Sequence, residues 1–268
     1  MELIAKISKG TKMDQIYIPK NRPGLSAGDY VIIKSLEVQK PAENPYLYNI
    51  KSIEPIKLEI VNEIFGIIDK SLDYANIIIT GSFIEQSFKF NDIDILIITE
   101  ENNPKLDGIK AKIKERIGIA PHIIAVNNRG LIKGLETDPL YQMMLSRCIS
   151  KKRIIYSYKS KINYKILDLH LLKSKSLLEN FDILRGGEKY YLTRNMIAIL
   201  LYLNNTKVNK REVDNEIKKI FNLDDIDEIK ENLLDKNKFI KKYRLVYNQL
   251  FKRTLEGINN ESKQKKHN

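Results

Sequence analysis

The run Ile77-Ile78-Ile79-Thr80-Gly81-Ser82 is followed, after nine residues, by Asp92-Ile93-Asp94-Ile95-Leu96-Ile97-Ile98. Short apolar runs rich in β-branched residues and bounded by turn residues predict two buried strands joined through a Gly-Ser turn. Side chains two positions apart on a strand point to the same face, about 6.5 Å from each other. Asp92 and Asp94 are therefore expected to converge, while Ile93 faces the other way.

Two carboxylates at this separation suit a hard cation such as Mg²⁺ (or Mn²⁺), which keeps several waters and takes its other ligands from substrate phosphates. Gly81 allows the backbone to approach a phosphate closely, and Ser82, opening a helix, presents its hydroxyl and nearby N–H groups to an anion. The pattern predicts a metal site at Asp92 and Asp94 beside a nucleotide-binding site at Gly81 and Ser82.

This segment resembles the polymerase β nucleotidyltransferase superfamily, in particular its minimal members of the archaeal type, whose hallmark is Gly-Ser, a spacer and Asp-x-Asp between strands. The tetrapeptide Asn91-Asp92-Ile93-Asp94 is similar to the usual Ser-Asp-hydrophobic-Asp, and the resemblance covers about residues 57–158. It implies an enzyme that uses Mg²⁺ to move a nucleoside monophosphate from an NTP to an acceptor hydroxyl, with RNA as a candidate acceptor. Asp92 and Asp94 would be its catalytic metal ligands.

Active members of that superfamily carry a third carboxylate on the next strand, where this chain has Ala120-Pro121-His122-Ile123. His122 stands at the third position. An imidazole can ligate a metal, but Mg²⁺ prefers oxygen, so the exchange would weaken or alter a second metal site. A hydrogen-bonded residue at a strand end is the alternative interpretation of His122, and Glu136 or Asp138 in the following loop could supply an acid instead.

The missing carboxylate leaves a second function open, a non-catalytic nucleotide-binding or DNA-binding regulator built on the same fold. A third and narrower hypothesis is nucleotidylation of a partner protein, which the resemblance also allows. The excess of basic residues in the second half of the chain argues against this third hypothesis.

The domain organisation follows from changes in periodicity. We expect an α+β protein with a small β unit at 1–40, a proline-containing linker at 41–55, a nucleotidyltransferase-like α/β domain at 56–160, a helical bundle at 161–260 and a polar tail at 261–268. The strands expected in the α/β domain are 76–80, 93–99, 121–126 and 153–156, and its helices are 56–72, 104–117 and 139–149. The helices expected in the bundle are 166–181, 190–203, 210–221, 226–234 and 239–258.

The first 40 residues contain Ile16-Tyr17-Ile18-Pro19-Lys20 and then Leu25-Ser26-Ala27-Gly28-Asp29-Tyr30. This pattern resembles the swapped-hairpin domain of AbrB-type DNA-binding regulators, although the intervening segment is short for that family. The resemblance implies a homodimer formed through the β unit and contact with DNA. A small β appendage that packs on the next domain is the alternative.

The net charge of +12 lies in the second half of the chain, since residues 1–149 hold 19 basic and 19 acidic residues and residues 150–268 hold 27 and 15. Such asymmetry favours a nucleic-acid partner for the basic half, with a lysine-rich solvated surface as the alternative. The residues considered for this contact are Lys151-Lys152-Arg153, Lys218-Lys219, Lys241-Lys242-Tyr243-Arg244, Tyr247 and Phe251-Lys252-Arg253.

Other features exclude or limit function classes. No apolar run approaches the ~18 residues that span a bilayer and the start shows no signal-peptide pattern, so we expect a cytoplasmic protein with no membrane partner. Cys148 is the single cysteine, which excludes an intrachain disulfide and a cysteine zinc cluster and predicts core packing. Weaker predictions assign Glu85 to a helix capping box, Arg129 to solvent or a triphosphate, and His170, Tyr141, Tyr190 and Tyr191 to packing rather than to a site.

Overall fold

The computed structural model describes residues 7–18, 20, 24, 26–28, 44–86, 88 and 90–264. The chain divides into two compact units, Met1–Pro41 and Ala42–Asn268. In the first unit, β1 (Ile7–Ser8) pairs antiparallel with β2 (Gln15–Ile16). Most of the rest of the β unit expected at 1–40, including Asp29 and Tyr30 of the AbrB-like pattern, lies outside the described residues.

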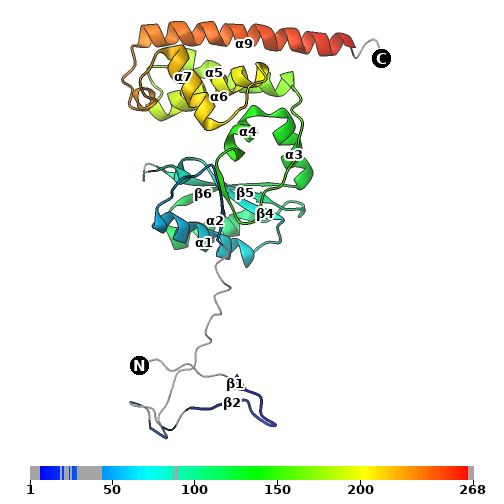
Figure 1. Ribbon diagram of the computed structural model, residues 1–268, viewed down its shortest axis with the longest axis vertical. Coiled ribbons are helices and arrows are strands. Elements are labelled where there is room, and N and C mark those ends of the chain that lie inside the picture. Colours follow the sequence, from blue (N-terminus) through cyan, green and yellow to red (C-terminus); the bar gives the residue numbers. More distant parts are fainter. Residues whose placement is uncertain are drawn as a thin grey trace. The chain divides into compact units, whose positions relative to one another are not determined.

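The second unit holds a five-stranded mixed sheet with the order β3-β7-β4-β5-β6 (Figure 1). Its strands are β3 (Tyr46–Tyr48), β4 (Asn76–Thr80), β5 (Asp92–Ile98), β6 (Ala120–Val126) and β7 (Cys148–Ser150). Strands β5 and β6 are parallel and the other neighbours antiparallel. Helix α2 (Leu106–Ile117) makes the crossover that a parallel pair requires.

Both faces of the sheet are covered, which explains why β4 and β5 read as continuous apolar runs. Ile93, Ile95 and Ile97 belong to the core formed with α1 (Pro55–Asp69) and α2. Leu96 and Ile98 belong to the opposite core, formed with α3 (Asn128–Thr137) and α4 (Pro139–Leu145). Because residues two apart share a face, Asp92 and Asp94 lie on the side of α3 and α4.

The helical half of this unit is built around α6 (Gly186–Leu203), most of whose residues are buried on all sides. The helices around it are α5 (Tyr164–Asn180), α7 (Lys210–Phe221), α8 (Asp227–Lys230) and α9 (Lys236–Gln264). Helix α4 packs on α6, and the Tyr202 hydroxyl donates to the carbonyl oxygens of Glu136 (2.8 Å) and Lys161 (2.7 Å). These contacts join the helical half to the sheet.

The mixture of a sheet and a helical half is confirmed, with nine α-helices in the described part of the chain. The strand predicted at 153–156 is wrong, because the last strand is β7 at Cys148–Ser150 and the preceding helix ends at Leu145. A three-residue strand is too short to show a period. Strand β3 lies in the segment 41–55 that was expected to be a linker, at the sheet edge where nearby prolines are tolerated.

The remaining differences concern helix ends. Helix α3 was not foreseen, since the sequence there suggests a loop; it begins after Asn127, whose side chain accepts a hydrogen bond from the Gly130 N–H (2.7 Å). Helix α8 has four residues where nine were expected, and α9 reaches Gln264, into the predicted polar tail. No helix among the described residues is long and apolar enough to cross a membrane.

Candidate nucleotide and metal site

The Gly-Ser turn follows directly on β4. Gly81 has φ 84° and ψ −157°, a conformation that is essentially restricted to glycine. Ser82 then opens a 3-10 helix, η1 (Ser82–Ile84), with its side chain exposed while Phe83 and Ile84 are buried. The buried pair anchors the turn and leaves the serine hydroxyl in solvent.

Position 81 requires glycine because of the neighbouring Asp94 side chain as well as because of its backbone angles. A Cβ atom at this position would lie 2.1 Å from Oδ2 of Asp94 and 3.0 Å from its Cγ. The register places Thr80 opposite Asp94, so the carboxylate occupies the space that a side chain on the turn would fill. The Gly-Ser turn and the second aspartate therefore lie next to each other.

Asp92 and Asp94 lie at the start of β5 with Ile93 fully buried between them. Asp92 is exposed, and the Asp94 side chain keeps 38% of its accessible surface. Both carboxylates can therefore reach a solvated ligand at the edge of the sheet, as their spacing indicated.

His122 enters the site through the parallel pairing of β5 and β6, which sets it opposite Asp94. Its Nδ1 lies 2.9 Å from Oδ1 of Asp94, and its side chain is 61% exposed. Because a carboxylate only accepts, Nδ1 carries the proton in this contact. In the neutral imidazole, Nε2 is then left with a lone pair.

The side chains at the site determine whether it fits the expected divalent cation. No group of three or more His, Cys, Asp or Glu side chains suited to hold a metal occurs among the described residues. Two accessible carboxylates nevertheless fit one Mg²⁺ ion, because this cation keeps several waters and shares its coordination with substrate phosphates. Asp92 and Asp94 are the residues that would hold it, together with a bound nucleotide.

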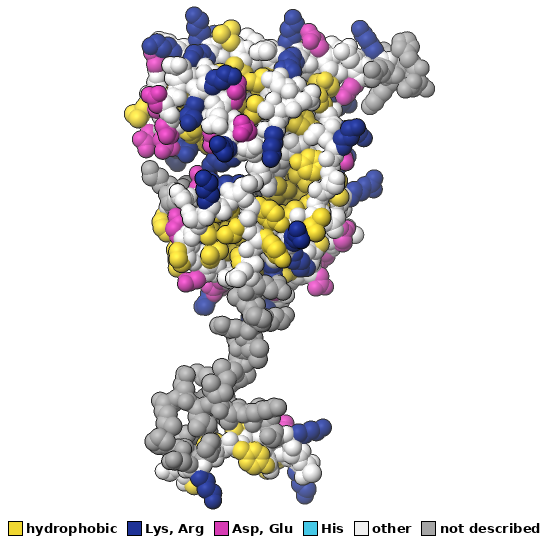
Figure 2. Space-filling model, viewed as in Figure 1, with side chains coloured by type: hydrophobic (Ala, Val, Ile, Leu, Met, Phe, Trp, Pro, Cys, Tyr) yellow, Lys and Arg dark blue, Asp and Glu magenta, His cyan; other side chains and the backbone are white. Residues whose placement is uncertain are grey.

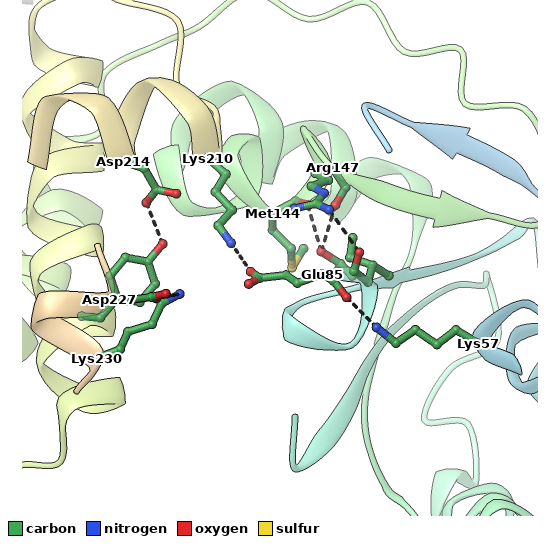
Figure 3. A network of polar contacts seen from close by, with 11 residues as sticks. Lys57, Glu85, Met144, Arg147, Lys210, Asp214, Asp227 and Lys230 are labelled. Atoms are coloured by element: carbon green, nitrogen blue, oxygen red, sulfur yellow. Dashed lines mark hydrogen bonds and ion pairs between the residues drawn. The ribbon is translucent and has the colours of Figure 1, made fainter. Parts of the chain in front are cut away.

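The end of β4 is held by the connection between α4 and β7. The Thr80 hydroxyl donates to the Met144 carbonyl (3.0 Å), and Nη2 of Arg147 donates to the Ile84 carbonyl (3.2 Å). Figure 3 shows Arg147 and Met144 beside η1, on the opposite side from Lys57, which donates to the carbonyl of Glu85. The turn that carries Ser82 is therefore fixed from two sides.

Glu85 does not cap a helix, so that prediction is wrong. The 3-10 segment has only three residues, so Glu85 lies at its end, and Gly81 at its start receives no side-chain cap. Its carboxylate instead forms an ion pair with Lys210 of α7 (Figure 3). This pair connects the helical half to a position three residues after Ser82.

The other predicted residues lie elsewhere. Glu136 belongs to α3, and Asp138 cannot serve as the missing acid because its Oδ1 caps α4 (2.8 Å to the Leu140 N–H) while Oδ2 contacts Nε2 of His170 (3.1 Å). His170 is thus a packed and hydrogen-bonded residue, as expected. Tyr190 and Cys148 are buried, Tyr141 is half-buried, and Tyr191 and Arg129 are exposed.

The nucleic-acid contact considered for Tyr243 and Tyr247 of α9 is contradicted. Tyr243 is fully buried with its hydroxyl donating to the Ser174 carbonyl (2.9 Å), and Tyr247 is nearly buried. Arg253 is likewise structural, since its guanidinium donates to Asn204 Oδ1 (2.8 Å) and the Leu203 carbonyl (2.9 Å). Lys151 pairs with Asp69. Several of the basic residues selected from the sequence therefore stabilise the fold.

A half-buried acid in the helical half, Asp214, was missed, because no local pattern distinguishes it. The Tyr190 hydroxyl donates to Oδ1 of Asp214 (2.7 Å), and Figure 3 shows Asp214 beside Lys210. Desolvation is the main cause that raises the pKa of Asp214, and the hydrogen bond from Tyr190 opposes the rise. Desolvation also raises the pKa of Tyr190.

Replacing Asp214 by asparagine should change how stability depends on pH. A carboxyl whose pKa is raised on folding contributes stability that is complete below its unfolded pKa and is lost as pH rises through the folded pKa. Between pH 4 and pH 7, the free energy of unfolding of Asp214→Asn should therefore rise relative to that of the parent chain. The reason is that the amide cannot ionise and still accepts the hydrogen bond from Tyr190. Urea unfolding across this pH range measures both free energies, with the exposed Glu115→Gln as a charge control. A difference between Asp214→Asn and the parent chain that stays constant with pH would contradict the prediction.

Comparison with known proteins adds no relative: neither family models, nor curated proteins, nor solved structures give a significant match to this chain.

Proposed function

We propose that this chain is a metal-dependent nucleotidyltransferase that moves a nucleoside monophosphate from an NTP to an acceptor hydroxyl, with RNA the favoured acceptor. The observation that carries the proposal is the contact between Gly81 and Asp94, in which a glycine-only turn makes room for a carboxylate on the neighbouring strand. This arrangement supports the resemblance to the polymerase β superfamily, because it joins the phosphate-binding turn to the metal-binding strand.

The roles of the residues follow from their chemistry. The exposed Ser82 hydroxyl donates to a triphosphate oxygen, and Asp92 and Asp94 hold the cation that accompanies the nucleotide. A bound Mg²⁺ supplies neutralisation of the charge that develops on the phosphates. The acceptor oxygen bonds to the α-phosphorus while the bond between the α- and β-phosphates breaks, and pyrophosphate leaves with the electron pair. The chain contributes positioning and charge rather than a nucleophile.

His122 is the group that takes the acceptor proton. Its Nδ1–H is held by Asp94, which orients the ring and leaves the Nε2 lone pair in solvent. A positioned base of this kind contributes about 10²–10⁴-fold to a rate. The histidine thus replaces the third carboxylate in function, at the position where the resemblance places that acid.

His122→Ala should lower nucleotidyl transfer by about 10²-fold or more, because the proton acceptor is lost. His122→Asp should keep most of the activity, since a carboxylate can accept the same proton and bind a cation. Initial rates at saturating NTP measure both variants. Equal rates for the parent chain and His122→Ala would remove His122 from the mechanism, and nucleotide binding unchanged in both variants controls for the fold of the site.

The deciding experiment is label transfer. The full-length chain is incubated with each α-labelled NTP, Mg²⁺ or Mn²⁺, and in turn total RNA, single-stranded DNA and cell protein as acceptors. Transfer to RNA is expected, and its loss in Asp92→Asn is the specific control. Transfer to protein alone would favour nucleotidylation of a partner, and no label on any acceptor would contradict an enzyme.

A second function is favoured by one observation, His122 opposite Asp94 at the position where the resemblance places a third carboxylate. In that case the chain is a nucleotide- or DNA-binding regulator. It would bind nucleotide without turnover, and salt-dependent DNA binding would survive the double change Asp92→Ala with Asp94→Ala but disappear on deletion of residues 1–40. Turnover of NTP, or no DNA binding at all, removes this candidate.

A further inference from the structure

A cavity of about 1510 Å³ lies at the same end of the strands as Asp92 and Asp94. Strand pairing sets Thr80 opposite Asp94 and places Tyr48, the last residue of β3, opposite Cys148, the first residue of β7. The residues just beyond these strand ends, Asn49 and Arg147, line the cavity. The cavity therefore opens at the same end of the strands as the candidate site, next to β3 and β7, whereas the aspartates and His122 lie on β5 and β6 and do not line it.

The helical half forms the facing wall of this cavity. Lys207, Lys210 and Arg211, at the start of α7, line it together with Tyr156 and Tyr158 of the segment that follows β7. Figure 2 shows the molecule hollowed between the helical half and the sheet half, with Lys and Arg side chains around the hollow. The ion pair between Lys210 and Glu85 stands beside the turn that carries Ser82.

The wall carries an excess of cations that lack protein counter-ions. Seven Lys or Arg and four Asp or Glu residues line the cavity. Lys210 is paired with Glu85, and Lys230 with Asp227 at 3.1 Å. Arg147 donates to the carbonyl oxygen of Ile84. The other four, Lys51, Lys207, Arg211 and Lys218, form no ion pair with another residue of the described chain. Cations gathered in one concave surface attract a polyanion.

Aromatic rings stand among these cations. Tyr158 is 41% exposed, and Tyr156 is half-buried, where desolvation raises the pKa of its phenol. Cations that follow a phosphate backbone, combined with rings that stack bases, are the means by which proteins bind single-stranded nucleic acid. A duplex keeps its bases paired and offers no face to Tyr158. The volume also exceeds the roughly 300–1,000 Å³ of small-molecule pockets, and protein interfaces are depleted in lysine.

We propose that this cavity binds the single-stranded end of a nucleic-acid acceptor and delivers its terminal hydroxyl past Glu85 and Lys210 to Asp92 and Asp94. The inference rests on the proposed function, to which it adds the surface that holds the acceptor and the single-stranded form in which the acceptor binds. It assigns phosphate contacts to Lys51, Lys207, Arg211 and Lys218, and base stacking to Tyr158. Of these residues, only Lys218 was among those considered for nucleic-acid contact from the sequence pattern.

Binding is measured without NTP, by fluorescence anisotropy of a 5′-labelled single-stranded RNA of about 12 nucleotides, within the range of known single-strand sites. The double change Lys207→Ala with Arg211→Ala should weaken binding about tenfold or more. It should also reduce the slope of log K against log salt by about 1.4, since each phosphate contact to a single strand contributes about 0.7. The matched control is Lys241→Ala with Arg244→Ala on the exposed surface of α9, which should change binding less than about twofold.

The aromatic contact has its own pair of variants. Tyr158→Ala should weaken RNA binding about fivefold or more, whereas Tyr158→Phe should retain it, because stacking needs the ring and not the hydroxyl. Loss of RNA binding only in the α9 control would overturn the assignment of the cavity and would place the binding surface on α9. Tighter binding of a blunt duplex than of the single strand would overturn it as well.

Failure of the inference is distinguishable from failure of the proposed function. If the cavity variants lose RNA binding but no NTP is consumed by the parent chain, the cavity assignment stands and the enzyme proposal falls. If label is transferred and both transfer and RNA binding are unchanged in the cavity variants, the enzyme proposal stands and the cavity assignment falls. Asp94→Asn, tested in the same binding assay, should bind RNA as the parent chain does.

Discussion

Replacing Asp94 by asparagine is expected to lower nucleotidyl transfer about a thousandfold or more. A metal-binding charge contributes several kcal/mol to stabilising the transition state, and about 4 kcal/mol corresponds to three powers of ten in rate. Asparagine has nearly the same shape and its Oδ1 can still accept from Nδ1 of His122, so the turn at Gly81 is not disturbed. Single-turnover transfer of an α-labelled nucleotide to RNA measures the effect.

The control for Asp94→Asn is Asp107→Asn, which removes the same charge from a fully exposed position in α2. This control should transfer label at the parent rate. Thermal unfolding of both variants should stay close to that of the parent chain, because Asp94 is half-exposed. Full activity of a folded Asp94→Asn chain would contradict the proposed function at its central residue.

The second large effect is expected from Gly81→Ala. The backbone angles of Gly81 are strained for any other residue, which costs about 1–3 kcal/mol. The added methyl would overlap Oδ2 of Asp94 at 2.1 Å, so the carboxylate must move away from its position. We therefore expect lower stability in urea together with loss of transfer comparable to that of Asp94→Asn.

A double-mutant cycle separates the two causes. Combining Gly81→Ala with Asp94→Ala removes the overlap with Oδ2 and Cγ but leaves the backbone strain, so the two changes should be less than additive in stability. Gly108→Ala is the matched control, because a Cβ there meets nothing within 4 Å. It lies in α2 and should stabilise the chain by about 0.5–1 kcal/mol. Additive effects in the cycle would show that Gly81 and Asp94 are not coupled.

The interpretation of the helical half changes once its side chains are placed. Lysine runs and tyrosines at helical spacing suggested a nucleic-acid surface on α9, but Tyr243 and Tyr247 belong to the core and Arg253 holds the end of α6. Helical spacing alone cannot distinguish a stacking face from a packing face, because both place aromatic rings on one side of a helix. Four cations without an ion pair, Lys51, Lys207, Arg211 and Lys218, line the cavity and come from segments far apart in the sequence.

The sequence by itself determined the strands β4 and β5, the two carboxylates on one face and the need for glycine in the turn before Ser82. These are local properties, set by alternation along a strand and by the conformational freedom of glycine, so they do not depend on the rest of the chain. The helical character of the second half was determined in the same way. Boundaries and short elements, such as β3, β7 and α3, were not, because a few residues show no period.

Only the tertiary structure decided which distant groups meet. The parallel pairing of β5 and β6 brings His122 to Asp94, and the docking of α7 brings Lys210 to Glu85. The contact of Asp214 with Tyr190 follows from the packing of α6 and α7. Each contact joins residues more than twenty positions apart, so neither periodicity nor spacing can predict it. The cavity beside the aspartates has the same origin, because its walls come from segments that are brought together only when the helical half folds onto the sheet.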